Sequence, residues 1–170
     1  MKMPLPTPNF LRLASDPRLR CHIPVMITTS RALGVDPGSV RIGLSLSDDI
    51  GFMAHPLQTL QVKGEQTAES AAQIAAVAAE KGSPVIVIGL PRNMNGTYGP
   101  AAEKSRALAS ALAPLTTARV ILWDERLTTA AATRRLQEAG RDSREQREVI
   151  DQAAAVQILQ DWLDAQSFAL

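Results

Sequence analysis

Residues 32–49, ALGVDPGSVRIGLSLSDD, decide the fold of this chain. A short apolar run ends at Asp36, a Pro-Gly pair follows, and apolar residues then alternate with small or polar ones over residues 41–47. Period-two alternation beside a Pro-Gly turn predicts a β-hairpin. The carboxylate of Asp36, at the tip of an otherwise apolar strand, has two readings: it caps the turn by accepting backbone hydrogen bonds, or it binds a metal or acts on a substrate. The hairpin alone favours neither reading.

The composition indicates a single globular domain with an aliphatic core. Of 170 residues, 45% are hydrophobic but only 4% are aromatic, so aliphatic side chains must fill the interior. Eighteen Lys and Arg against seventeen Asp and Glu give a net charge of +1, which neither supports nor excludes a nucleic-acid partner. The single cysteine, Cys21, excludes an intramolecular disulfide and fits a reducing compartment. Because the sequence has neither a long apolar run nor a signal-peptide pattern, we expect a cytoplasmic protein with no membrane contact.

The first thirty residues differ from the rest of the chain. Residues 1–30 hold five of the eleven prolines, three arginines and little hydrophobic periodicity, which predicts a flexible N-terminal arm. Such a basic arm either contacts a nucleic acid or is simply solvated, and the second reading is favoured. We therefore expect one folded domain over residues 31–166.

Strands and helices follow the hairpin in a regular order. Pro56 interrupts an apolar stretch at 52–60, which places that strand at a sheet edge. The β-branched run at 84–90 is typical of a strand buried on both faces between parallel neighbours. The other expected elements are a strand at 119–123 and helices at 66–81, 100–113, about 128–139 and about 144–164. This order predicts the α/β class, with a mixed five-stranded sheet flanked by helices.

Three carboxylates are expected to meet at one edge of this sheet. Asp36 ends the first strand and Glu125 directly follows the last, and ligands of open α/β sheets bind beyond the carboxyl ends of the strands. Asp151 heads an apolar row of the closing helix, and it either leans over the same edge or faces water beside that row. Converging carboxylates repel unless a cation lies between them. Since cysteine and paired histidine ligands are lacking, that cation should be Mg²⁺ or Mn²⁺, in a number that the sequence leaves open.

Donor side chains near the same edge suggest a phosphate-containing substrate. Arg92 and Asn93 precede a helix N-terminus, where free backbone N–H groups favour anions. Arg41 and Arg126 lie close to the acidic residues in sequence, and an arginine can bind two phosphate oxygens at once. Metal ions held by carboxylates beside such donors can hydrolyse phosphodiesters. From these residues alone, a polar loop without a ligand is an equally good interpretation of the stretch around Arg92.

Four motifs, in order along the chain, resemble those of the YqgF (RuvX) family of Holliday-junction-resolvase-like pre-16S rRNA nucleases, which have the RNase H-like fold. The motifs are residues 34–48, 87–96, 124–129 and 149–160. The resemblance implies a metal-dependent endonuclease that processes the 5′ end of pre-16S ribosomal RNA during ribosome biogenesis, in the cytoplasm. It also implies an acidic triad of Asp36, Glu125 and Asp151, whereas residues 1–30 lie outside it.

Three other interpretations stay open at this stage. The same chemistry could act on a Holliday junction or other branched DNA, because phosphate contacts carry no information about sequence or sugar. The chain could instead be a nucleic-acid-binding module without catalysis. An actin-like ATPase, which shares the Gly-x-Asp-x-Gly pattern, is a weaker alternative because it needs a second domain across the nucleotide cleft. The sequence also leaves open whether the protein forms a homodimer.

Overall fold

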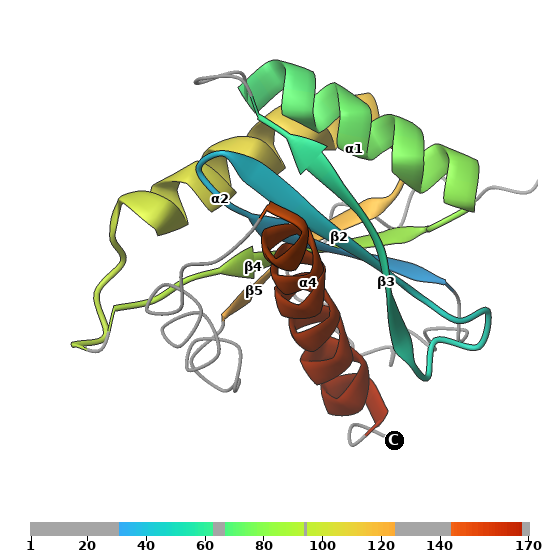
Figure 1. The fold of residues 1–170 in the computed structure, drawn as a ribbon. Helices are drawn as coiled ribbons and strands as arrows, with labels where there is room; N and C mark the ends of the chain where they lie inside the picture. The colour runs from blue at the N-terminus through green and yellow to red at the C-terminus, as the bar shows by residue number, and fades with distance from the viewer. Residues whose placement is uncertain (1–30, 63–66, 94, 125–143, 168–170) are drawn as a thin grey trace, which may run out of the picture.

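The computed structural model describes residues 31–62, 67–93, 95–124 and 144–167, which form five strands and flanking helices (Figure 1). The elements are β1 (Ala32–Pro37), β2 (Arg41–Ser47), β3 (Ala54–Gln61), α1 (Thr67–Lys81), β4 (Val85–Leu90), α2 (Pro100–Leu112), the 3-10 turn η1 (Ala113–Leu115), β5 (Arg119–Asp124) and α4 (Arg144–Ser167). The expected α/β class is therefore confirmed. The expected helix at 128–139 and the arm at 1–30 lie outside the described residues.

The sheet is mixed, with the strand order β3-β2-β1-β4-β5. The first three strands form an antiparallel meander, while β1, β4 and β5 run parallel to one another. Pro56 lies in the edge strand β3, where its missing N–H breaks no hydrogen bond to a further strand. The pairing of β3 with β2 shifts in register between Leu44 and Ser45. All six residues of β4 are buried between two parallel neighbours, as the β-branched run predicts.

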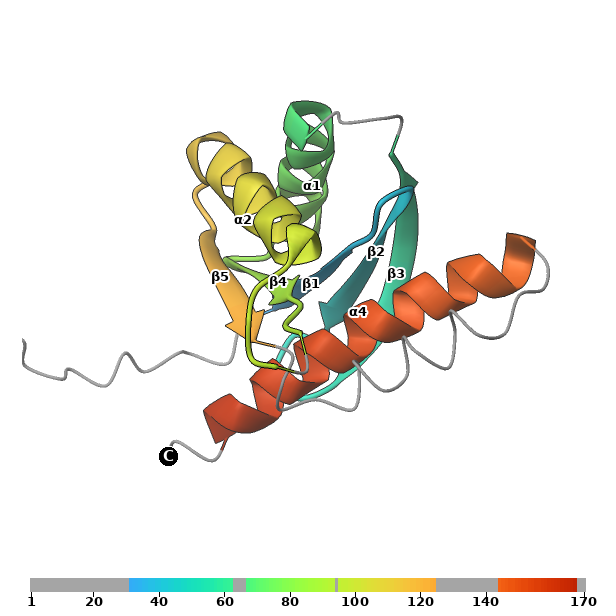
Figure 2. The same ribbon diagram turned by 90° about the vertical axis from the view of Figure 1, so that its left-hand side faces the viewer.

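Helices cover both faces of the sheet, as the two views in Figure 1 and Figure 2 show. Side chains of successive strand residues point to opposite faces, so β1 divides its residues between two cores. Leu33 and Val35 pack with α1 and α2, whereas Ala32 packs with α4. The small residues of α1, such as Ala71 and Ala78, allow that helix to lie close on the sheet.

The face of the sheet under α4 is built from small residues. A Cβ added at Gly34 would lie 2.7 Å from Leu159 Cβ and 2.9 Å from the carbonyl oxygen of Ala155. The hydroxyl of Ser45 donates a 2.8 Å hydrogen bond to that same carbonyl. Glycine and serine therefore let the backbone of α4 approach the strands more closely than larger side chains would allow. Within the described residues, no helix has both the length and the apolar character needed to cross a membrane.

Candidate active site

Asp36 lies near the end of β1 and is buried, with a relative exposure of 6%. Its partner across the antiparallel pair is Gly43 of β2, and directly opposed residues of such a pair point to the same face. On the other side, β4 pairs in parallel register, so Gly89 follows Ile88 at the level of Asp36. The residues beside Asp36 on both neighbouring strands are therefore glycines.

Gly43 brings the backbone of Asp151 to the same position. A Cβ added at Gly43 would lie 2.0 Å from the carbonyl oxygen of Asp151 and 3.3 Å from the backbone nitrogen of Gln152. Because Asp36 points to the face on which that Cβ would project, Asp36 and Asp151 lie on the same side of the sheet, beside Gly43. The packing of α4 on β2 therefore places the backbone of Asp151 on the same face of the sheet as Asp36, and the convergence of their carboxylates stays a prediction.

Arg41, at the start of β2, forms an ion pair with Asp151. Its Nε lies 2.5 Å from Oδ2 of Asp151, and the two side chains are 20% and 24% exposed. The guanidinium therefore balances the charge of this carboxylate, and a metal ion would compete with Arg41 for Oδ2. Arg41 was expected to contact a phosphate, and that contact stays a prediction.

Arg92 lies where β4 leads into α2, and three neighbours hold its side chain. Its Nε donates to the carbonyl oxygen of Gly96, and its Nη1 donates to Oδ2 of Asp124 over 3.3 Å. Its Cζ lies 5.0 Å from the centre of the Tyr98 ring. Since Asp124 ends β5 and pairs with Leu90 at the end of β4, Arg92 lies at the carboxyl edge of the parallel strands.

Asn93 organises the loop that follows Arg92. Its backbone N–H donates to the carbonyl oxygen of Thr97 over 2.9 Å, and its side-chain amide donates to the Thr97 hydroxyl over 3.0 Å. Gly96 supplies the positive φ of 82° that this tight turn needs. The side chain of Asn93 is thus engaged in shaping the loop, and its expected phosphate contact stays a prediction.

Glu125 and Arg126 lie outside the described residues, so their predicted roles are carried forward as proposals. Within the described part of the chain, no group of three or more His, Cys, Asp or Glu side chains could hold a metal ion. Asp36 and Asp151 nevertheless supply carboxylate oxygens, the ligands that Mg²⁺ and Mn²⁺ prefer. The chemistry of this donor set fits a hard divalent cation, and Gly89 adds no side chain next to Asp36.

Comparison with known proteins shows to which family this chain belongs. The RuvX family, described as Holliday junction resolvase, matches residues 30–165. The chain belongs to the RuvX family. Curated relatives named "Putative pre-16S rRNA nuclease" include those of Pelotomaculum thermopropionicum, 46% identical over 80% of this chain and 88% of the relative, and Myxococcus xanthus, 47% identical over 79% and 88%.

A solved structure of T. thermophilus RuvC in complex with a Holliday junction substrate shares the fold. It superposes with a TM-score of 0.52 at 15% identity and covers 82% of this chain and 96% of RuvC. The predicted RNase H-like fold of this RuvX chain is therefore confirmed. The family match begins at residue 30, next to the predicted boundary of the N-terminal arm.

Several features of this RuvX site were missed by the sequence analysis. It did not identify Gly43 as the contact point of α4, Asp151 as the partner of Arg41, or Tyr98 as a neighbour of Arg92. A signal for the first was present, because Gly43 and Ser45 place small residues on one face of a strand, a pattern that indicates close approach of another backbone. The contact of Arg41 with Asp151 joins residues 110 positions apart, so no local pattern predicts it.

Proposed function

We propose that this RuvX protein is a metal-dependent endonuclease that hydrolyses phosphodiester bonds at the 5′ end of pre-16S ribosomal RNA, in the cytoplasm. The observation that carries the proposal is that buried Asp36 lies opposite Gly43, where the backbone of Asp151 contacts β2, at the carboxyl end of β1. The names of the curated relatives support the choice of RNA substrate.

In this proposal Asp36 and Asp151 would hold Mg²⁺ or Mn²⁺, and Glu125 would complete the ligand set. When bound, a divalent ion of this kind supplies a water activated for attack and stabilises the charge on the leaving oxygen. The protein holds the metal-binding side chains in fixed positions. Asp36 is held by pairing on both sides of its strand, and Asp151 by the seating of α4 on Gly43.

Arginine and amide donors would bind the substrate backbone. Arg92 retains donor groups beyond those used for Gly96 and Asp124, because a guanidinium has five N–H groups in a rigid fork. Arg126 and Asn93 would add contacts on the same edge. A cation at Asp151 would repel the guanidinium of Arg41 and weaken its pair with Oδ2, which would leave Arg41 free to contact a phosphate.

Branched DNA is a second candidate substrate, because the description of the family is Holliday junction resolvase. Phosphate contacts alone do not distinguish it from RNA. Cleavage of a precursor rRNA fragment and of a four-way DNA junction, side by side with the same enzyme preparation, separates the two.

The decisive experiment compares Asp36→Asn with the wild type in MgCl₂. The amide keeps the shape of the side chain but cannot supply the carboxylate charge, so cleavage should fall to background while binding of the RNA fragment without magnesium persists. Asp164→Asn, at an exposed position on the same helix as Asp151, is the matched control and should cleave like the wild type. Full magnesium-dependent cleavage by Asp36→Asn would overturn the assignment.

A further inference from the structure

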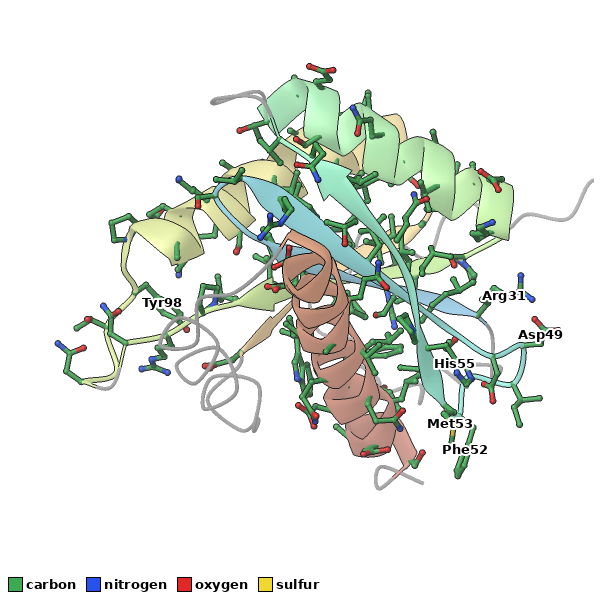
Figure 3. All side chains as sticks on the ribbon, viewed as in Figure 1. Arg31, Asp49, Phe52, Met53, His55 and Tyr98 are labelled. Carbon is green, nitrogen blue, oxygen red and sulfur yellow. The ribbon has the colours of Figure 1, made fainter. Side chains whose placement is uncertain are left out.

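Two arginines and a tyrosine form a compact cluster where β4 leads into α2. The Cζ atom of Arg106 lies 4.4 Å from the centre of the Tyr98 ring, and that of Arg92 lies 5.0 Å from it. Both distances are within the range of cation–π attraction, about 6 Å. Figure 3 shows Tyr98 on the connection before α2, on the side of the molecule away from the exposed Phe52 and Met53. One aromatic ring therefore holds two cationic side chains in one place.

The local backbone explains how these residues meet. Arg106 lies in the second turn of α2, and helical side chains lean toward the helix N-terminus, so its guanidinium extends back to the loop that carries Tyr98. The positive φ of Gly96 turns the chain so that its carbonyl oxygen accepts a hydrogen bond from Arg92. The loop thus brings Arg92 to the ring of Tyr98, and the helix brings Arg106 to the same ring.

Both arginines keep donors that could bind an anion. Arg92 uses Nε and Nη1, and Arg106 uses Nη1 for a 2.5 Å contact with Glu103. Among the described residues, the Nη2 groups of both make no hydrogen bond. The Glu103 side chain is 65% exposed, so its pair with Arg106 is weak in water and readily replaced.

The cluster of Arg92, Tyr98 and Arg106 lies at the same edge of the sheet as Asp36. β1 and β4 are parallel neighbours, so the end of β4 and the loop after it lie at the same sheet edge as Asp36. Two positive charges held near one ring repel each other, and a bound anion between or beside them relieves that repulsion. A nucleic-acid strand presents such anions at regular intervals.

We propose that Arg106 is a further phosphate-binding residue and that Tyr98 is a positioning residue, which holds Arg92 and Arg106 for phosphates of one strand beyond the cleavage site. The proposal rests on the proposed function for its nucleic-acid substrate. Because guanidinium groups lie against the tyrosine ring, we assign the ring to orienting the arginines rather than to stacking on a base.

The test measures the salt dependence of binding to a labelled RNA fragment spanning the 5′ end of a 16S precursor, together with kcat and KM. Loss of one phosphate contact reduces the slope of log K against log[salt] by about 0.7 for a single strand. Arg106→Gln should show this reduction and a raised KM, with kcat within about twofold of the wild type. Arg119→Gln is the matched control, because Arg119 is an exposed arginine that begins β5, at the amino ends of the parallel strands and opposite the Arg92 loop.

The role of Tyr98 is tested by two further variants. Tyr98→Phe keeps the ring and should retain the wild-type slope and KM, whereas Tyr98→Leu should raise KM and lower the slope without changing kcat. A merely structural role would instead lower the melting temperature and leave the salt slope unchanged in the folded protein.

The outcomes distinguish this proposal from the proposed function. An unchanged slope and KM in Arg106→Gln overturns the phosphate contact of Arg106, even if Asp36→Asn abolishes cleavage. A reduced slope in Arg106→Gln supports the contact, even if Asp36→Asn cleaves normally and the catalytic assignment fails. If Tyr98→Phe behaves like Tyr98→Leu, the positioning role of the ring is wrong.

Discussion

Replacement of Gly43 by alanine tests the close contact of α4 with β2, which places the backbone of Asp151 beside Gly43. The new Cβ would lie 2.0 Å from the carbonyl oxygen of Asp151, about 1.4 Å short of an ordinary van der Waals contact. The obstacle is helix backbone, so α4 itself must move by about that distance. Overpacking of this kind costs roughly 1–3 kcal/mol, and the shift also carries the carboxylate of Asp151 away from Arg41 and weakens their pair. We expect a loss of about 2–3 kcal/mol in the free energy of unfolding.

Urea denaturation measures the stability change, and magnesium-dependent cleavage measures its consequence for the site. A domain of this size with ordinary stability stays almost fully folded after such a loss, at 25 °C. A displacement of about 1 Å at a catalytic group can cost roughly 100-fold in rate, so kcat should fall far more than the folded fraction does.

Gly34→Ala is the comparison for this experiment, because its added Cβ also meets α4, but at Ala155 and Leu159, one turn or more beyond Asp151. It should destabilise the protein to a similar degree and reduce kcat much less. An unfolding free energy of Gly43→Ala within about 0.5 kcal/mol of the wild type, or an undiminished kcat, would refute the close approach.

Three other changes have definite expectations. Arg41→Met leaves the half-buried carboxylate of Asp151 without its cation, so the melting temperature should fall, and added MgCl₂ should raise it by more than in the wild type; an equal magnesium effect in both proteins would contradict this. Burial raises the pKa of the Asp161 carboxyl above its usual 3.8, so the folded state disfavours the charged form and loses stability as the pH rises through that raised pKa. Asp161→Asn should therefore raise the melting temperature at neutral pH and change it little below pH 3.8, and a thermal scan that shows no such pH dependence would argue against the burial effect. Removal of residues 1–30 should leave the melting temperature and RNA cleavage unchanged, because the family match begins at residue 30, and a marked loss of either would give the arm a structural or binding role.

The elements that follow from local patterns were correctly predicted from the sequence. The hairpin followed from alternation around a Pro-Gly turn, the edge position of β3 from Pro56, and the buried parallel strand from the apolar run at 84–90. Each of these signals lies within about ten residues, and each reflects a backbone or burial requirement of the element itself.

The partners of charged residues could not be predicted in the same way. Arg41 was expected to bind phosphate because of its position on a strand near Asp36, but its partner Asp151 lies 110 residues away. Which carboxylate an arginine meets depends on how a helix is seated on the sheet, and that seating depends on packing across the whole domain. The roles of Glu125 and Arg126, which lie outside the described residues, stay predictions.

The position of α4 in the chain has a consequence for how the protein becomes active. Every strand of the sheet precedes this helix in the chain, so Asp36 is synthesised long before Asp151. A nascent chain that has completed the sheet still lacks the second carboxylate of the pair. The proposed nuclease would thus gain activity only when α4 has left the ribosome and docked on Gly43, so docking of this helix is the step that converts an inert sheet into a competent enzyme.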